Sequence, residues 1–424
     1  MMLAGGAAAI AGASLGAGIA HAGFGAPTAL READPKTAPL QPLGKSAVEP
    51  FWGTHQSGII TPAQNATYFA AFDIVTDKRD EVIKLLKKWT EAAARMSNGQ
   101  TVEPDVTPAG ETVDSSDVLG LPASRLTITF GFGPGLFIKD GHDRFGLKSR
   151  RPEALVDMPK FSGDQLVEAR TGGDISVQAC ADNPQVAFHA VRQLARMADY
   201  IAQIRWTQAG FVSNQPDDST PRNLLGFKDG TGNPHVEKPA IADKFVWVGS
   251  EGPDWMQGGS YAVARRARIA LEHWDKMKIA FQEQTIGRQK LSGAPLGLKN
   301  ETDAVDLTLM DKDGNPFIPE NSHIRLATAT ANDGVEILRR SYSYNDGVNL
   351  TAERWPPWRQ GMEYDAGLLF MCYQRDPRTG FIKIFDKLSK FDMLNQFVTH
   401  VGGGLFACPA GAKEGEFIGQ RLFV

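Results

Sequence analysis

The order of apolar and polar positions in the first half of the chain predicts strands and helices in turn. Residues Thr67–Thr76 (TYFAAFDIVT) are mostly apolar, which predicts a largely buried strand. The polar segment Asp77–Asp80 follows and predicts the start of a helix with an aspartate as its N-cap. The apolar positions of that helix recur at helical spacing, at Val82, Leu85, Leu86 and Trp89.

Two further strands and a second helix follow in the first half. Alternating apolar residues predict a strand over Arg125–Phe130, and another apolar run predicts one over Asp174–Cys180. Asn183 and Pro184 then begin a long helix whose apolar positions continue to Ile201. This order of strand, helix, two strands and helix is typical of an α+β domain with an antiparallel sheet covered by helices on one face.

The second half of the chain repeats part of this pattern. Alternation over Ser260–Trp274 predicts one long strand, and the run Gly367–Gln374 predicts a buried strand followed by a helical stretch through Leu388. The segments ISVQACADNP (175–184) and LLFMCYQRDP (368–377) both place a strand with one cysteine before a proline that precedes a helix. This internal similarity predicts an α+β fold of two duplicated ferredoxin-like domains.

Changes in composition divide the chain into four regions. We expect a signal peptide over 1–22, a linker over 23–50, an N-terminal ferredoxin-like domain over 51–215 and a C-terminal one over 216–424. The linker contains five prolines and has no apolar periodicity. The two domains are expected to join around 207–225.

The first 22 residues contain no Asp, Glu, Lys or Arg and are mostly alanine and glycine. They end in Ala20-His21-Ala22, the A-x-A form of a signal-peptidase site. We therefore expect export, with cleavage after Ala22 and no stable membrane span in the mature protein. A single membrane anchor is the alternative, because a run of about 20 uncharged residues can span a bilayer.

The overall composition is typical of a soluble globular protein, with 42% hydrophobic and 22% charged residues among 424. The chain has 45 Lys and Arg against 49 Asp and Glu, a net charge of −4. That balance gives no sign of the positive surface that nucleic acids require, so no nucleic-acid partner is expected. Cys180, Cys372 and Cys408 are far apart and odd in number, which argues against a disulfide framework.

Three short clusters concentrate glycine and polar residues outside regular periodicity. They are NLLGFKDGTGNP (223–234), PENSHIRL (319–326) and ILRRSYSY (337–344). Taken singly, each has an ordinary structural explanation. An Asp-Gly pair is commonly a turn, a lone histidine is more often structural than a ligand, and a pair of arginines is commonly solvated.

Taken together and in this order, the clusters resemble motifs of the dye-decolourising haem peroxidases. The first resembles the G-x-x-D-G signature of that family, SHIRLA (322–327) its proximal-histidine motif and LRRSYSY (338–344) its distal-arginine motif. Further similar segments are FWGTHQSGIITPAQ (51–64), IGRQKLSGAPLG (286–297), GLLFMCYQRD (367–376) and VGGGLFACPA (401–410). The resemblance covers almost everything from residue 50 onward and is greatest for the exported deferrochelatase/peroxidase branch.

The resemblance implies a fold, a cofactor and roles for individual residues. It implies two ferredoxin-like domains of the dimeric α+β barrel type, with antiparallel sheets and one haem b (heme b) in a pocket of the C-terminal half. His323 is implied as the axial iron ligand, Asp229 as the acid–base for peroxide and Arg339 as the cation that stabilises developing charge. These residue types suit the chemistry, which needs one ligand, a proton acceptor and a fixed positive charge.

Two expectations follow for the surroundings of these residues. Apart from Arg340, the sequence identifies no other cation near the iron, so we expect Arg339→Leu to slow the peroxide reaction at least as much as Asp229→Asn. A hydrogen-bond partner for the second ring nitrogen of His323 is expected, although the sequence does not identify it.

Further residues are expected to touch the haem through their backbone. Glycines beside the aspartate allow the chain to approach the porphyrin closely. The residues expected to line the haem there are Gly230, Thr231 and Gly232. The family branch often continues its histidine motif as Asn-Pro-Arg, whereas this chain has Thr328, Ala329 and Thr330. Backbone contacts from these three residues are expected to replace an arginine beside a haem propionate.

The resemblance implies a haem-dependent peroxidase that reduces hydrogen peroxide and oxidises bulky organic reductants such as dyes or porphyrinogens. The alternatives are a deferrochelatase that releases iron from haem, and a non-catalytic haem carrier. The implied partners are peroxide, an organic reductant or haem, components of an iron-uptake system, and a second copy in a homodimer. The branch typically uses a twin-arginine signal, so periplasm or cell surface is expected, although this chain lacks the arginine pair.

Overall fold

In the first half of the computed structural model, the predicted strands and helices occur in the predicted order, but they are followed by a strand that was not predicted, β4 (Ala202–Phe211). The structure describes residues 47–103, 114–214, 219–349 and 363–424. The elements of the first half are β1 (Ala66–Ile74), α1 (Arg79–Ser97), β2 (Thr127–Phe132), α2 (Pro134–Phe137), β3 (Ile175–Ala181), α3 (Pro184–Ala198) and β4 (Ala202–Phe211). Antiparallel pairing arranges the strands as β2-β3-β1-β4, which is the ferredoxin-like order.

The two long helices of this half begin in different ways. Asn183 caps α3, because its side chain accepts a hydrogen bond from the backbone N–H of Gln185 and Pro184 occupies the first turn. The predicted aspartate cap of α1 is wrong: Lys78 holds the N-cap position and makes no side-chain cap. Helix α3 also ends before Ile201, because the backbone turns at Asp199, whose φ is 46°.

The second half has the same strand order with different connections. Its strands and long helix are β5 (Ser260–Ile269), β6 (Leu338–Arg339), β7 (Tyr342–Asn349), β8 (Glu363–Gln374), α8 (Phe381–Phe391) and β9 (Val398–Cys408). Pairing gives β9-β5-β8-β7, and the two-residue β6 pairs with β8. Both halves are therefore ferredoxin-like, as predicted.

The connection between β5 and β6 differs from the single helix of the first half. It contains three short helices, α5 (Leu271–Trp274), α6 (Ile279–Ile286) and α7 (His323–Ala327), and α4 (Pro239–Phe245) precedes β5. The predicted continuous strand Ser260–Trp274 is wrong, because the strand ends at Ile269 and a helical turn buries Trp274. This long connection supplies several walls of the site described below.

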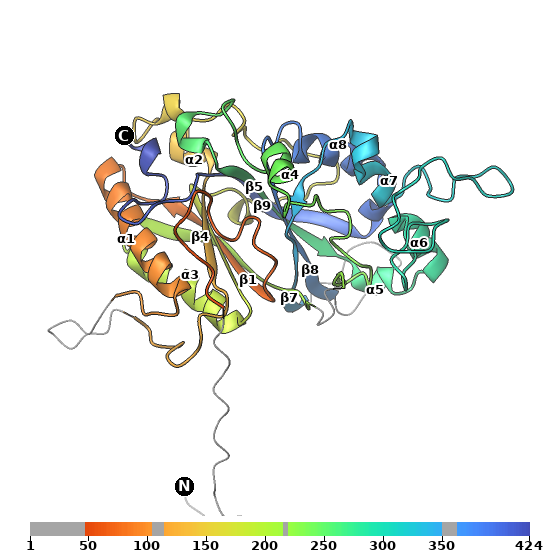
Figure 1. Ribbon diagram of the computed structural model, residues 1–424, viewed down its shortest axis with the longest axis horizontal. Coiled ribbons are helices and arrows are strands. Elements are labelled where there is room, and N and C mark those ends of the chain that lie inside the picture. The colour runs from red at the N-terminus through yellow and green to blue at the C-terminus, as the bar shows by residue number, and fades with distance from the viewer. Residues whose placement is uncertain (1–46, 104–113, 215–218, 350–362) are drawn as a thin grey trace, which may run out of the picture. The chain divides into compact units, whose positions relative to one another are not determined.

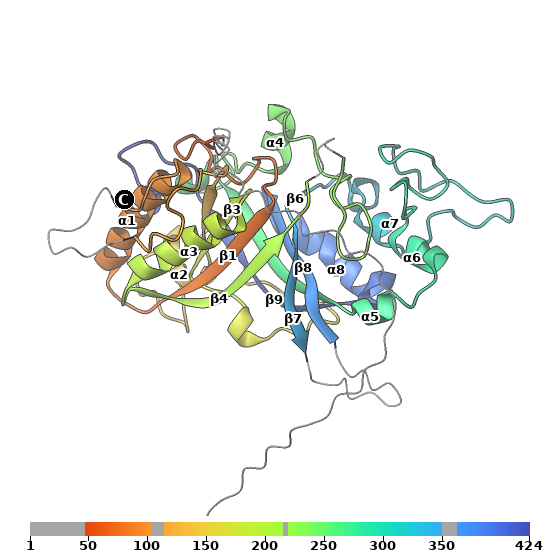
Figure 2. The same ribbon diagram turned by 90° about the horizontal axis from the view of Figure 1, so that it is seen from below.

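The two sheets join into one closed antiparallel barrel. Phe132 of β2 pairs with Ala407 of β9, and Phe211 of β4 pairs with Ser343 of β7. Helices α1 and α3 lie beside β1–β4, whereas α8 lies beside β8 and α7 packs against α8 (Figure 1 and Figure 2). The predicted boundary at 215/216 falls on residues 215–218, outside the described part, and stays a prediction.

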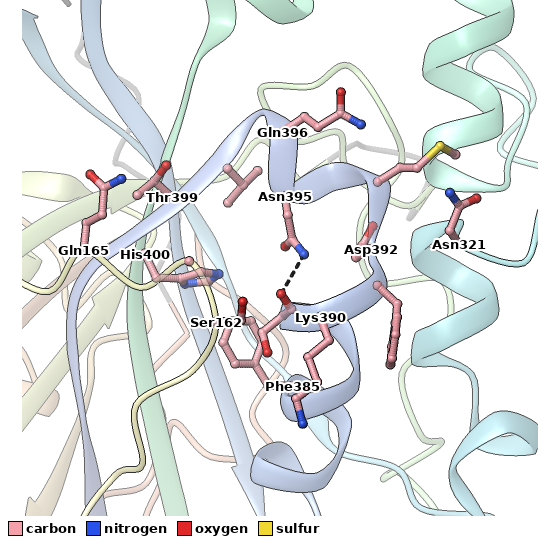
Figure 3. Close-up of a pocket in the computed structure, with 15 residues that line it drawn as sticks. Ser162, Gln165, Asn321, Phe385, Lys390, Asp392, Asn395, Gln396, Thr399 and His400 are labelled. Atoms are coloured by element: carbon pink, nitrogen blue, oxygen red, sulfur yellow. Dashed lines mark hydrogen bonds between the residues drawn. The ribbon is translucent and has the colours of Figure 1, made fainter. Parts of the chain in front are cut away.

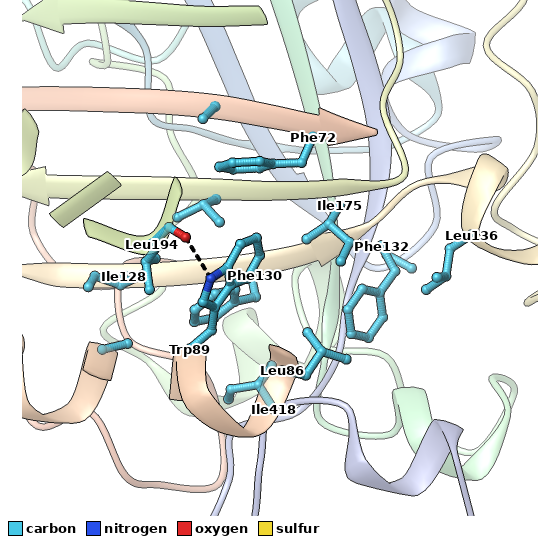
Figure 4. Packing of buried hydrophobic residues seen from close by; sticks show 14 of the residues in the cluster. Phe72, Leu86, Trp89, Ile128, Phe130, Phe132, Leu136, Ile175, Leu194 and Ile418 are labelled. Atoms are coloured by element: carbon cyan, nitrogen blue, oxygen red, sulfur yellow. Dashed lines mark hydrogen bonds between the residues drawn. The ribbon is translucent and has the colours of Figure 1, made fainter. Parts of the chain in front are cut away.

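The first half is filled by large apolar side chains. Trp89 of α1 packs against Phe72, with ring centroids 5.1 Å apart, and against Phe130, with centroids 6.1 Å apart (Figure 4). Its indole N–H donates to the Leu194 carbonyl at 2.8 Å, which satisfies the polar atom of a fully buried ring. The sheet and both long helices thus share one apolar core.

Several predictions concern the chain ends and the cysteines. The signal peptide expected over 1–22 and the linker up to residue 46 lie outside the described residues. Within the described ranges, no helix has both the length and the apolar character needed to cross a bilayer. Cys180, Cys372 and Cys408 are all buried with free thiols.

Candidate functional site

A cavity of about 640 Å³ brings the three sequence clusters together in the second half of the chain. Asp229, His323 and Arg339 all line it. Its apolar walls include Leu225, Phe227, Ile286, Leu368, Phe370, Phe381, Ile384 and Leu388. Residues separated by more than a hundred positions therefore face one mostly apolar space with a few polar groups, which is typical of a ligand site.

Asp229 and Arg339 form the polar pair of this cavity. An Nη1 atom of Arg339 lies 3.4 Å from Oδ1 of Asp229, and the two side chains are 28% and 25% exposed. Asn223 donates its amide to the other carboxylate oxygen at 3.3 Å. Asn233 fixes the arginine backbone, because it accepts from the Arg339 N–H at 3.0 Å and donates to the Arg339 carbonyl at 2.8 Å.

The segment after Asp229 also lines the cavity, as Gly230, Thr231 and Gly232. Gly230 has a φ of 117°, a conformation that favours glycine. A Cβ atom on Gly232 would lie 3.8 Å from Nη2 of Arg339, so the chain passes close to that guanidinium. The Thr231 hydroxyl donates to Glu301 at 2.9 Å and is therefore turned toward the opposite loop.

His323 is the first residue of α7 and is held by Asp392. Its Nδ1 lies 2.6 Å from Oδ2 of Asp392, which leaves Nε2 as the nitrogen available to a ligand. The other carboxylate oxygen accepts from the Leu394 N–H at 2.8 Å, so the buried Asp392 is itself fixed. Burial by itself would lower the pKa of His323, but the Asp392 carboxylate outweighs burial and raises it. Asp392 is thus the partner that the sequence could not identify.

The adjacent arginines point to different parts of the molecule. Arg339 lines the cavity, whereas Arg340 is buried and donates to the Thr61 carbonyl and to Oε1 of Gln64. The two residues are neighbours on an extended segment beside β8, where successive side chains leave opposite faces. This geometry agrees with the choice of Arg339 over Arg340 for the cavity.

A second cation in the cavity was not identified from the sequence. Arg288 lines the cavity and is 8% exposed, and its Nη1 donates to the carbonyls of Gly293 at 2.7 Å and Glu301 at 3.0 Å. Burial lowers the pKa of Arg288, and the charge of Arg339 lowers it further. The sequence identified no cation near the iron besides Arg339 and Arg340, whereas in the structure Arg288 also lines the cavity. Arg288 lies inside IGRQKLSGAPLG, a segment to which the sequence had assigned no role.

Lys228 and Glu301 connect two loops of the cavity wall. They form an ion pair, and both side chains are mostly buried. Burial acts to raise the pKa of Glu301, but hydrogen bonds and the charge of Lys228 outweigh it, so that pKa is lowered. Glu301 therefore stays ionised and ties its loop to the segment that contains Asp229.

The three residues expected beside a propionate do not share one environment. Thr328 and Ala329 line the cavity. Thr330 is exposed and is not among the cavity-lining residues in the described part of the chain, so the structure does not bring it to the site. The roles of Thr328 and Ala329 toward a propionate stay predictions.

The cavity fits a flat, largely apolar cofactor with one axial ligand. The apolar walls suit a porphyrin face, and the free Nε2 of His323 suits iron. Among the described residues, no group of three or more His, Cys, Asp or Glu is placed to hold a metal ion. The fold and site together define an α+β barrel protein with a mostly apolar cavity, lined by a histidine whose Nε2 is free to bind a ligand.

Comparison with known proteins gives the family. The sequence profiles described as Dyp-type peroxidase, N-terminal and Dyp-type peroxidase, C-terminal match residues 56–212 and 220–413. The chain is 38% identical to the dye-decolorizing peroxidase of Thermobifida fusca, over 87% of this chain and 83% of that protein. It is 35% identical to the deferrochelatase of Escherichia coli O157:H7, over 90% and 89% of the two chains.

Solved structures agree with the sequence matches. The oxyferrous complex of DtpA from Streptomyces lividans superposes with a TM-score of 0.80 at 38% identity, covering 90% of this chain and 98% of that one. A DyP-type peroxidase from Streptomyces coelicolor also superposes with a TM-score of 0.80. It is 39% identical in sequence, and the match covers 89% of this chain and 98% of that one. The chain therefore belongs to the Dyp-type peroxidase family and is a haem peroxidase.

Proposed function

We propose that the chain reduces hydrogen peroxide with Asp229 as the acid–base and Arg339 as the charge-stabilising group, and that it oxidises bulky organic reductants. The observation that carries this proposal is the pair itself. A carboxylate and a guanidinium lie 3.4 Å apart in the same cavity as a histidine with a free Nε2.

The residues divide the chemistry between them. Haem, when bound, supplies the redox-active iron at which the O–O bond is cleaved. Asp229 accepts the proton from one peroxide oxygen and returns it to the other, a role that needs a positioned group within hydrogen-bond reach. Arg339 stabilises the negative charge that develops during cleavage.

His323 would hold the iron through Nε2, with Asp392 accepting the proton of Nδ1. The carboxylate fixes the ring orientation and makes the imidazole a stronger donor to the metal. Leu225, Phe227 and the other apolar walls exclude water around the cofactor, which strengthens the electrostatic effect of Arg339.

A visible spectrum before and after peroxide tests the function. The purified protein is expected to show a Soret band that shifts on addition of peroxide, and His323→Ala is expected to fold with little or no haem. A protein that binds no haem overturns the proposal. Normal haem content with an unchanged spectrum in His323→Ala overturns the axial assignment alone.

A second candidate is release of iron from haem with the tetrapyrrole intact. The match to a protein named deferrochelatase, over 90% of this chain, favours it. Chromatography of the pigment after incubation of the protein with haem and a reductant distinguishes the two candidate functions. Iron-free porphyrin supports iron release, and unchanged haem supports the peroxidase alone. A passive carrier would need neither Asp229 nor Arg339 in the cavity.

We also propose export with cleavage after Ala22, which gives a mature protein that begins at Gly23. The uncharged segment that ends in Ala-His-Ala supports this. Mass spectrometry of protein recovered outside the cytoplasm tests it, and full-length protein confined to the cytosol would contradict it.

A homodimer and contact with iron-uptake components stay predictions. Light scattering tests the homodimer, and co-purification tests the contact with iron-uptake components.

A further inference from the structure

A second hollow of about 460 Å³ lies on the side of the barrel where α8 leads into β9 (Figure 3). We call it the proximal groove, and its polar lining includes Ser162, Gln165, Asn321, Gln396, Thr399 and His400. Gln165, Asn321 and Gln396 are exposed, so the groove is open to solvent at these residues. Apart from Asn321, which belongs to the cluster PENSHIRL, these residues lie outside the motifs that indicated the function.

The inner end of the proximal groove meets the haem cavity. Phe385, Asp392 and His400 line both spaces. Asp392 is also the residue that accepts from Nδ1 of His323. A molecule in the groove would therefore be separated from the predicted axial ligand by one carboxylate, without entering the cavity.

The groove offers neutral hydrogen-bonding groups. In the described part of the chain, the side chains of Gln165, Asn321 and Thr399 make no hydrogen bond. The charges there are already paired, since Lys390 bonds Asp386 at 2.7 Å and Asp392 bonds His323. Amides both donate and accept, so this lining suits an uncharged molecule with hydroxyl groups rather than an ion.

Apolar surface lies beside these polar groups. Phe385 and Met393 line the groove, and the Phe385 ring meets the His400 ring edge to face, with centroids 4.6 Å apart and planes at 81°. A volume of this size is within the usual range for sites that hold small organic ligands. The neutral polar groups and the apolar side chains of the groove together suit an aromatic ring that carries a hydroxyl group.

His400 has an unused polar atom. Its Nδ1 is buried and has no hydrogen-bond partner in the described part of the chain. Burial lowers the pKa of His400 well below its usual value, and the charge of Arg265 lowers it further, so the ring is neutral. A neutral imidazole can accept a hydrogen bond from a phenol.

We propose that the proximal groove binds phenolic reductants and that His400 accepts the phenolic proton as the ring is oxidised. The proposal rests on the peroxidase function above, which supplies the oxidant. The phenol O–H bond breaks; the electron goes to the peroxide-oxidised enzyme, the proton goes to Nδ1 of His400, and a phenoxyl radical leaves. Two such steps balance one peroxide, since two phenols and hydrogen peroxide give two phenoxyl radicals and two waters.

A weakly basic acceptor is adequate for this step. Removal of an electron makes a phenolic O–H strongly acidic, so even a histidine with a low pKa takes the proton. The imidazolium is disfavoured beside Arg265, and the proton then passes to solvent through the open groove. The same unfavourable charge returns His400 to its neutral form for the next phenol.

Equilibrium binding of guaiacol to the holoenzyme, followed by calorimetry without peroxide, tests the site. Gln165→Trp places a bulky ring in the groove and is expected to weaken binding by a factor of about ten or more. Gln203→Trp is the matched control, because Gln203 is exposed on β4 and its side chain makes no hydrogen bond in the described part. Equal affinity in both variants would overturn the site.

Turnover of two kinds of reductant tests the proton acceptor. His400→Gln is expected to slow oxidation of guaiacol by about tenfold more than oxidation of ABTS, which has no O–H to lose. Equal effects on both reductants, at normal haem content, would overturn the role of His400. A wild-type protein that fails to react with peroxide would instead overturn the peroxidase function, and guaiacol binding would still report on the groove.

Discussion

The two halves of the chain share one strand order but use their interiors differently. In the first half, α1 and α3 lie on the sheet and Trp89 fills the space between them. In the second half, the connection after β5 is divided into α5, α6 and α7, and the corresponding region contains a cavity of about 640 Å³. The same topology thus supports a core filled by Trp89 and its neighbours in one half and the cavity in the other.

The difference shows which part of the fold carries function. Strand pairing is antiparallel in both sheets, so the sheets alone do not distinguish the halves. The three site residues lie outside the long strands. Asp229 belongs to the connection between β4 and β5, and His323 to the connection between β5 and β6. Arg339 belongs to the short β6, which pairs with β8. Binding residues on loops held by a rigid sheet are the usual arrangement.

The largest effect is expected from the cavity pair. Asp229→Asn should lower the second-order rate constant for peroxide by about 10²–10⁴-fold, because it removes the positioned proton acceptor. Arg339→Leu should lower it by about 10²–10³-fold. Because Arg288 lies in the same cavity, the order expected from the sequence reverses and Asp229→Asn becomes the more severe change. Stopped-flow measurement of the Soret change gives both rate constants.

Two further variants sharpen this ranking. Asp313→Asn removes an exposed carboxylate in a loop outside the cavity lining and should leave the rate unchanged. The double variant Arg288→Leu/Arg339→Leu should be slower than Arg339→Leu if Arg288 substitutes for it. Equal rates for the double and single variants would restore the original ranking.

The next effect concerns stability and compares two phenylalanines. Phe130 is 1% exposed in the first-half core, whereas Phe370 is half-buried and lines the cavity. Phe130→Ala should lower the free energy of unfolding of the haem-free protein by about 3–5 kcal/mol. Phe370→Ala should lower it less, because one side of that ring already faces open space. Urea unfolding of both variants gives the comparison, and equal losses would show that the halves are packed alike.

A smaller effect is expected from Asp392→Asn. The amide still contacts His323 but cannot accept its proton as strongly, so haem affinity should fall by about 10–100-fold. Transfer of haem to an excess of apomyoglobin measures the loss. Asp386→Asn is the control and should retain haem normally, because Asp386 lies in α8 just before Asp392 and pairs with Lys390.

The smallest effect is expected from Thr330→Ala. Thr330 is exposed and outside the cavity lining, so haem content and the Soret maximum should stay as in the unaltered protein. Ala329→Trp, at a residue that lines the cavity, should reduce haem content. Loss of haem in Thr330→Ala would mean that the Thr330 side chain helps to hold the cofactor although it lies outside the cavity lining.

Apolar patterns predicted β1, β2, β3, β5 and β8, whose residues are mostly buried. They did not predict β4, in which buried and exposed residues are mixed, nor β6, β7 and β9. The runs Thr67–Thr76 and Gly367–Gln374 correspond to β1 and to most of β8. The end of β5 was missed, because alternation continues through Glu272 although the backbone has already turned into a helix. Local pattern does not record where a tertiary contact, here the burial of Trp274, bends the chain.

The site was predictable where its residues belong to motifs. Asp229, His323 and Arg339 each stand in a recognisable cluster, and the cavity brings the three clusters together. Asp392 and Arg288 were missed, because an aspartate after a helix and an arginine in a polar loop look like ordinary surface residues. Only the three-dimensional contact with His323 and the burial beside Arg339 reveal them.

The closure of the barrel by pairing of β2 with β9 and of β4 with β7 has an evolutionary consequence. Two identical subunits that pair edge to edge must accept every mutation twice, once in each copy. A fused chain is free of that constraint, so one repeat can keep a conservative scaffold while the other diverges. Insertions after β5 could then accumulate without weakening Trp89 and its neighbours, and a symmetric ancestor could become an asymmetric enzyme.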